Sequence, residues 1–220
     1  MYSIAIDGPA GAGKSTIAKT IAKELEFVYV DTGAMYRAMA LYFIRHHVDE
    51  KNEEAINAAC DDIHVSLAYE DGMQQVLLNE ENVTGLIRTE EVGNMASKTS
   101  AYKKVRATLL DLQRNMAKTA NILMDGRDIG TNVLPNADLK IYLTASSKVR
   151  AERRYKELIE KGVDADLKQI EQDIITRDKQ DMEREIAPLK RAEDAVLVDS
   201  SDMTIQQVVD TVVNEFNKVK

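Results

Sequence analysis

Cysteine and proline are both scarce in this sequence. Cys60 is the only cysteine among 220 residues, so no disulfide can form within the chain. It falls in a stretch with helical character, where a small buried apolar role suits a free thiol. A chain without disulfides is typical of a reducing compartment, and we expect a cytoplasmic protein. Three prolines and ten glycines leave no low-complexity linker, so any lobes should be insertions into one domain.

Excess positive charge and long hydrophobic runs are also missing. The chain has 29 Lys and Arg against 37 Asp and Glu, a formal net charge of −8. This balance argues against a broad electrostatic surface for nucleic acid polymers or anionic lipid, so an anionic ligand must be bound by local groups. No stretch approaches the roughly 18 uninterrupted apolar residues that suit a membrane span, and the N-terminus has no basic leader. We therefore expect partners that are small molecules, with no nucleic acid and no membrane. We also expect a monomer.

Short apolar runs alternate with amphipathic stretches along most of the chain. Residues 2–7 (YSIAID) and 27–33 (FVYVDTG) indicate buried strands, and each is followed by helical periodicity, at 14–25 and 34–47. Further strands are expected at 121–125, 139–143 and 195–199, and a last helix at 204–220. This alternation predicts an α/β fold with a parallel sheet flanked by helices.

The middle of the chain departs from this alternation. Residues 64–79 (HVSLAYEDGMQQVLLN) hold two strand-like runs joined by Asp71-Gly72, a dipeptide that favours a two-residue hairpin turn. At about 150 residues per domain, the length suits one large domain with an inserted lobe. We expect a single domain over residues 1–220, with insertions at about 37–100 and about 147–165.

The strongest motif is GPAGAGKS, which fits the pattern G-x-x-x-x-G-K-[ST] between an expected strand and an expected helix. Its small side chains leave main-chain N–H groups to contact a phosphate, and the helix N-terminus adds about half a positive charge. Lys14 can reach the β- and γ-phosphates, Ser15 can bind Mg²⁺, and Thr16 offers a second hydroxyl. The motif predicts a P-loop NTPase fold whose ATP-binding residues are Gly8, Pro9, Ala10, Gly11, Ala12, Gly13, Lys14, Ser15 and Thr16.

Polar side chains follow two of the expected strands. Thr32 and Arg37 come after the second strand, and Asp125, Arg127 and Asp128 come after the third. Ligands of α/β proteins gather at the carboxyl ends of strands, and a guanidinium there can hold a phosphate through two hydrogen bonds. Asp125 can orient the waters of Mg²⁺, Arg127 can bind a phosphate, and Asp128 can bind an amine or hydroxyl. The alternatives are a solvated helix arginine at position 37 and an Asp-Gly turn with an internal ion pair.

A basic helix is expected over residues 146–161. Its Arg150, Arg153 and Arg154 are spaced i, i+3, i+4, where like charges repel unless an anion lies between them. This helix, followed by Gly162, is our candidate for a lid over nucleotide phosphates. The alternative is a solvated face on which Arg153 pairs with Glu157.

A second helix face is expected in the segment RDKQDMER. Arg177, Asp181 and Arg184 stand at i, i+4, i+7. Arginines beside a carboxylate suit a ribose monophosphate, whereas an internal brace of the helix is the alternative.

Six segments, taken together, resemble those of the bacterial cytidylate kinase family, a group of P-loop nucleoside monophosphate kinases. They are DGPAGAGKST, DTGAMYRA, EVGNMASK, DGRDIGT, RDKQDMER and APL, in this order and at similar spacing. The resemblance covers essentially the whole chain, and the hairpin segment is similar to that family's monophosphate-binding insert. It implies transfer of the ATP γ-phosphoryl group to CMP or dCMP. A kinase of another small acceptor and a non-catalytic ATP-binding regulator are the alternatives.

Residue roles are also implied by this resemblance. Thr32, Arg37 and Arg127 resemble ligands of the acceptor phosphate, and Ser97, Arg106 and Asp128 resemble readers of the cytosine edge. Arg177 and Asp181 are similar to sugar contacts, with Arg184 beside them. The expected CMP-binding residues are therefore Thr32, Arg37, Ser97, Arg106, Arg127, Asp128, Arg177, Asp181 and Arg184. The expected catalytic residues are Lys14, Arg127, Arg150, Arg153 and Arg154. Mg²⁺ is the expected cofactor, at Ser15 and Asp125.

Overall fold

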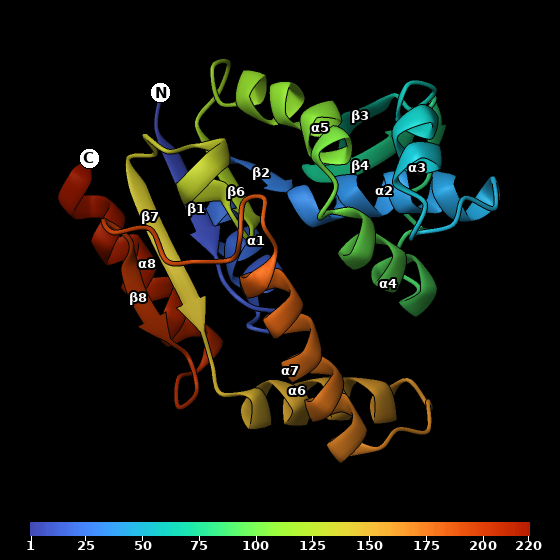
Figure 1. The fold of residues 1–220 in the computed structure, drawn as a ribbon. Coiled ribbons are helices and arrows are strands. Elements are labelled where there is room, and N and C mark those ends of the chain that lie inside the picture. Colours follow the sequence, from blue (N-terminus) through green and yellow to red (C-terminus); the bar gives the residue numbers. More distant parts are fainter.

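A parallel sheet of five strands forms the centre of the computed structural model, which describes all 220 residues (Figure 1). Its strands are β1 (Ser3–Asp7), β2 (Val28–Asp31), β6 (Ile122–Gly126), β7 (Leu139–Thr144) and β8 (Val196–Asp199). Their spatial order is β2-β6-β1-β7-β8, so β1 lies between β6 and β7. The predicted parallel sheet is confirmed.

Helices α1 (Lys14–Glu24) and α8 (Ile205–Val219) cover one face of this sheet. Ile4 and Ile6 of β1 are fully buried in the core that these two helices share with the sheet. Ala5, between them, faces the core on the opposite side. Successive side chains of a strand point to opposite faces, so one short apolar strand contributes to two cores.

A second unit lies beside the sheet and contains a small antiparallel sheet (Figure 1). Its strands are β3 (Val65–Glu70), β4 (Met73–Leu78) and β5 (Glu81–Asn82), packed with helices α2 (Thr32–Arg45), α3 (Glu53–Cys60), α4 (Glu90–Thr99) and α5 (Lys103–Met116). The β3–β4 hairpin turns at Asp71 (φ 50°) and Gly72 (φ 74°), the positive values that the predicted turn requires. Strand β5 was not expected, because two residues carry no periodic signal.

Strand β2 ends and helix α2 begins two residues earlier than the sequence predicts. The strand stops at Asp31, whose carboxylate accepts a hydrogen bond from the Ala34 N–H (2.9 Å). An aspartate at the N-cap satisfies one of the free N–H groups of a helix start. Thr32 therefore opens α2 rather than closing the strand.

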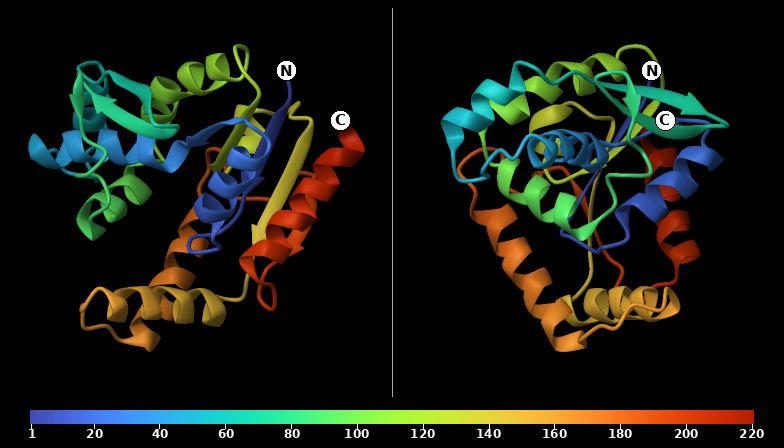
Figure 2. Two further views of the ribbon diagram at one scale, coloured as in Figure 1. Left: turned by 180° about the vertical axis from the view of Figure 1, so that it is seen from behind. Right: turned by 90° about the vertical axis from the view of Figure 1, so that its right-hand side faces the viewer.

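Helices α6 (Ser147–Glu160) and α7 (Leu167–Glu183) pack together at the carboxyl end of the sheet, and the chain between them passes through Gly162 (φ 72°) (Figure 2). The sequence places Arg184 on the same helix as Arg177, and this is wrong. Helix α7 ends at Glu183, and Arg184 has extended backbone (φ −62°, ψ 140°). Neither this pair nor any other helix of the chain is long and apolar enough to cross a membrane.

Candidate active site

The glycine loop joins β1 to α1 and has the backbone that its sequence demands. Gly13 is the N-cap of α1 in the left-handed region (φ 86°). A Cβ on Gly8 would lie 1.9 Å from the Leu143 carbonyl oxygen of β7, so no side chain fits there. The loop thus passes directly against the neighbouring strand, with its N–H groups at the start of a helix.

Lys14 is buried beneath this loop. Its Nζ donates to the carbonyl oxygens of Gly8 and Pro9, both at 2.8 Å. Burial, and then repulsion from Arg127, hold the pKa of the ammonium well below its usual range. The lysine charge is therefore weakly compensated, and a phosphate beside it would stabilise the charged form.

Ser15 and Asp125 meet at the base of the loop. The Ser15 hydroxyl donates to the Asp125 carboxylate (3.0 Å), and Tyr29 donates to its other oxygen (2.8 Å). Burial, and then the charge of Asp31, raise the pKa of Asp125. A hydroxyl and a buried carboxylate are oxygen donors of the kind that hard divalent cations prefer. The structure has no cluster of three or more His, Cys, Asp or Glu side chains that could hold a metal ion by itself.

Three arginines gather where β2 and β6 end. Arg37 donates to the Ile87 carbonyl oxygen (3.2 Å), and Arg127 donates to Asp181 (2.9 Å). Arg177 has no ion-pair partner, and its buried Nε makes no hydrogen bond. Burial, and then repulsion from Arg177, lower the pKa of Arg37 to about 10. This group of guanidiniums lacks enough negative charge of its own and is suited to an anion.

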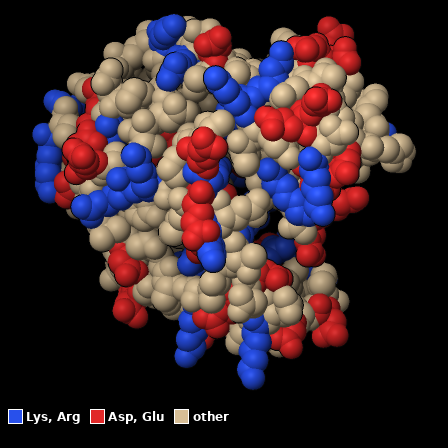
Figure 3. Space-filling view, viewed as in Figure 1, with Lys and Arg blue, Asp and Glu red and all other residues tan.

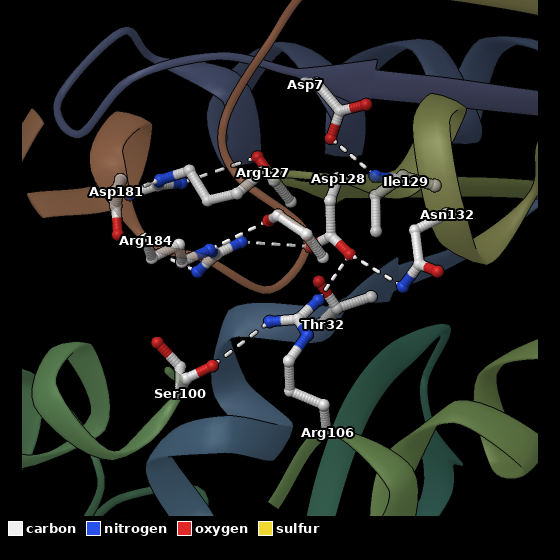
Figure 4. A network of polar contacts seen from close by, with 12 residues as sticks. Asp7, Thr32, Ser100, Arg106, Arg127, Asp128, Ile129, Asn132, Asp181 and Arg184 are labelled. Atoms are coloured by element: carbon white, nitrogen blue, oxygen red, sulfur yellow. Dashed lines mark hydrogen bonds and ion pairs between the residues drawn. The ribbon is translucent and has the colours of Figure 1, made fainter. Parts of the chain in front are cut away.

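Asp128 stands at the centre of a buried polar network (Figure 4). Its carboxylate accepts from Arg106, from Arg184 (3.3 Å) and from the Asn132 amide (3.0 Å). Directly after it, residues Ile129–Val133 form a π-helical turn, a rare form that often occurs at functional sites.

Asp7 ties this turn to strand β1 (Figure 4). Its carboxylate accepts from the N–H groups of Ile129 (2.8 Å) and Gly130 (2.7 Å). Burial raises the pKa of Asp7 to about 6, although the two N–H groups oppose that rise. The segment that carries Arg127 and Asp128 is thus fixed to the strand that leads into the glycine loop.

The basic helix α6 does not present an unpaired cationic face. Arg150 is buried and pairs with Asp178 of α7 (2.7 Å). Arg153 donates to the Ser200 carbonyl oxygen (2.6 Å). Glu157 pairs with Arg154 (2.9 Å), not with Arg153 as the surface alternative supposed. Each arginine already has a protein partner, two of them carboxylates, so a bound anion is not needed to relieve their repulsion, and their role toward nucleotide phosphates stays a prediction.

One cavity of about 720 Å³ brings these groups together between the sheet, the second unit and helices α6 and α7. Figure 3 shows this face hollowed, with basic side chains at the margin of the hollow. Every predicted site residue lines the cavity except Gly8 and Pro9, which shape the loop behind it. Ser97 contributes a buried hydroxyl that has no hydrogen-bond partner.

Sequence reasoning missed several residues that line the same cavity. Arg88 precedes α4 and pairs with Asp31 (2.6 Å). Tyr36 of α2 lies beneath the guanidinium of Arg106, 5.6 Å from ring centre to Cζ. At the other end, the lining includes Ser200, Met203, Thr204, Ile205 and Val208. The apolar spacing of the last helix pointed only to packing, and Arg88 lies in a segment without periodicity.

A glycine loop and lysine facing an arginine-lined cavity, at the carboxyl edge of a parallel sheet, define a P-loop phosphotransferase. A solved structure of an uncharacterized protein from Eubacterium ventriosum shares the fold, with a TM-score of 0.54 at 10% identity over 99% of both chains. The family described as cytidylate kinase matches residues 4–218.

Curated relatives agree with that match. A cytidylate kinase of Lactobacillus gasseri is 49% identical over 209 residues, 95% of this chain and 91% of its own length. A cytidylate kinase of Carboxydothermus hydrogenoformans is 46% identical over 206 residues, 94% of this chain and 93% of its own. The chain belongs to the cytidylate kinase family.

Proposed function

We propose that this protein transfers the γ-phosphoryl group of ATP to CMP or dCMP, releasing ADP and the diphosphate. The observation that carries the proposal is the single cavity in which the glycine loop faces Arg37, Arg127 and Arg177. Family membership supports the same reaction. Two anionic substrates fit the two cationic groups, one at each end of the cavity.

The donor end is formed by the glycine loop. We assign Gly8–Thr16 to the ATP phosphates, because the loop presents N–H groups at a helix start and Lys14 lies beneath it. Ser15 and Asp125 would hold a divalent cation, which we take to be Mg²⁺. When bound, the cation would neutralise phosphate charge and orient the transferred group.

The acceptor phosphate is assigned to Thr32, Arg37 and Arg127. The Thr32 hydroxyl donates to the Asp125 carbonyl oxygen (2.8 Å), which places it beside β6. Arg177, with its unpartnered Nε, lies close enough to repel both arginines, so it suits the acceptor phosphate as well as the sugar. Three guanidiniums can supply bidentate hydrogen bonds to one phosphate.

Base and sugar are assigned to the network around Asp128. A carboxylate accepts a hydrogen bond from the cytosine amine, while Arg106 and the Ser97 hydroxyl can donate to its acceptors. Uracil presents an oxygen where cytosine presents the amine, which leaves a buried mismatch costing about 1–3 kcal/mol. Asp181 and Arg177, with Arg184 beside them, are assigned to the ribose.

The reaction needs positioning more than proton transfer. A nucleoside monophosphate attacks through an oxygen that is already anionic, so no general base is required. Lys14, Arg127 and the α6 arginines Arg150, Arg153 and Arg154 would offset the charge of the transferring group. Helices α6 and α7 would exclude water as a competing acceptor when they close.

The decisive test measures ADP release with ATP and different acceptors. CMP and dCMP should support turnover well above UMP, AMP, shikimate and a blank without acceptor. Equal rates with CMP and UMP would contradict the assignment of the base readers. Turnover with shikimate alone would identify a kinase of another small acceptor, and ATP binding without turnover would identify a regulator. We further expect a cytoplasmic protein and a monomer; sedimentation of the purified protein would check the monomer, and fractionation of the cells would check the location.

A further inference from the structure

Gly93 lies buried near the start of α4, directly against Arg37 of α2. A Cβ built on Gly93 would lie 2.9 Å from Nη1 and 3.2 Å from Nη2 of that arginine. The guanidinium is held at this place by its Nη1, which donates to the carbonyl oxygens of Ile87 (3.2 Å) and Thr89 (3.5 Å). The planar guanidinium therefore packs directly against the Cα of Gly93.

The backbone gives no reason for a glycine at position 93. Gly93 is absent from the residues with positive φ, and its N–H donates to the Thr89 carbonyl oxygen (3.1 Å) as in any helix. A glycine inside a helix costs about 1 kcal/mol relative to alanine. The absence of a side chain at Gly93 leaves room next to its Cα, and the Arg37 guanidinium occupies that room.

An added methyl group would displace the guanidinium rather than the helix. The crowded atoms belong to the end of a flexible side chain, whereas α2 and α4 pack closely along their length. Burial and repulsion from Arg177 and Arg88 already lower the pKa of Arg37. Arg177 and Arg88 repel the Arg37 guanidinium, so neither can hold it in place once the added methyl group has displaced it.

We propose that Gly93 is a positioning residue for the acceptor phosphate, because its missing side chain fixes where the Arg37 guanidinium enters the cavity. This inference rests on the proposed role of Arg37 as a phosphate ligand. It predicts an unusual pair of effects for Gly93→Ala: weaker binding of the acceptor, together with equal or greater thermal stability.

The test uses the full chain in four variants: Gly93→Ala, Arg37→Ala, the double variant, and the control Gly85→Ala. Gly85 precedes the same helix in an exposed loop where an added Cβ meets no atom within 4 Å. Calorimetry with CMP alone gives the affinity, ADP release gives kcat and KM, and thermal unfolding gives the Tm. We expect Gly93→Ala to lower kcat/KM for CMP by about tenfold to hundredfold, with the KM for ATP unchanged. Gly85→Ala should match the wild type.

The double variant separates the possible causes. If Gly93 acts through Arg37, adding Gly93→Ala to Arg37→Ala should cause no further loss of CMP affinity. An equal loss in both backgrounds, or full affinity in Gly93→Ala, would refute the role of Gly93 while leaving that of Arg37 intact. Full affinity in Arg37→Ala would instead refute the phosphate role of Arg37 itself, and this inference with it.

Discussion

Replacement of Asp128 by asparagine removes a negative charge from between two buried guanidiniums. The side chains of Asp128, Arg106 and Arg184 are only 6–7% exposed. Arg106 has no other ion-pair partner, whereas Arg184 keeps Asp181 at 3.9 Å. Breaking a buried pair from one side costs about 3–5 kcal/mol, and the remaining partner of Arg184 favours the lower end. At about 2–4 °C per kcal/mol for a chain of this size, a loss of about 3 kcal/mol lowers the Tm by about 6–12 °C.

The same replacement should relax the choice of base. A carboxylate only accepts hydrogen bonds, but an asparagine amide can also donate to the oxygen of uracil. Removal of a buried mismatch worth about 1–3 kcal/mol should reduce the CMP-to-UMP ratio of kcat/KM by about fivefold to 150-fold. The KM for ATP should not change, because the proposed assignment places Asp128 at the acceptor end of the cavity.

Two measurements decide this prediction. Thermal unfolding gives the Tm, and ADP release with CMP and with UMP gives the ratio. The control is Asp111→Asn, which removes a carboxylate from the exposed face of α5 and should alter neither quantity. An Asp128→Asn protein that melts with the wild type and keeps its base ratio would refute the reasoning.

Three further changes test other parts of the site. Lys14→Met should lower kcat by at least about a hundredfold, because it removes a buried cation from the proposed phosphate site. Circular dichroism should still show a folded chain, and full turnover would contradict the role of Lys14. Burial raises the pKa of Asp7 from 3.8 to about 6, so between these pH values the folded state holds a proton that the unfolded state releases. The contribution of Asp7 to the free energy of unfolding should therefore fall as the pH rises from about 4 to above 6, by up to roughly 3 kcal/mol. Urea unfolding across this range should show a flatter profile for Asp7→Asn, and identical slopes would show that Asp7 does not titrate there. Arg150→Ala should lower the free energy of unfolding by about 3–5 kcal/mol, because it breaks a buried ion pair, whereas Arg154→Ala breaks an exposed pair and should lower it by less than about 1 kcal/mol. Both variants should have a lower kcat. An unchanged kcat would leave that arginine with a structural role only.

The parts that sequence could predict are those defined by local patterns. The glycine loop was located because strand, spacing and helix start all lie within about twenty residues of one another. The hairpin turn followed from Asp71-Gly72 alone, since few dipeptides accept two positive φ values. The ends of helices and strands are harder to predict where one side chain decides them. At Asp31, the hydrogen bond from the Ala34 N–H to the carboxylate begins α2 and so ends β2 two residues early.

The partners of charged side chains could not be predicted. Arg127 and Asp181 are 54 residues apart, and nothing local shows that α7 returns beside β6. Spacing placed Arg150, Arg153 and Arg154 near one another, but it could not show that Asp178 and Ser200 would reach them first. Long-range pairing depends on how the elements pack, and a helical period carries no information about that.

Strands β1 and β6 run side by side with Asp7 opposite Gly126, so the two loops that follow them start level with each other. In the assignment proposed here, the span between the donor and acceptor phosphates is therefore set by main-chain pairing and by the Asp7 carboxylate, not by helices α6 and α7 at the mouth of the cavity. Amino-acid substitutions at the far ends of the cavity could therefore change which nucleoside is preferred, while the distance between the two phosphate sites stays the same.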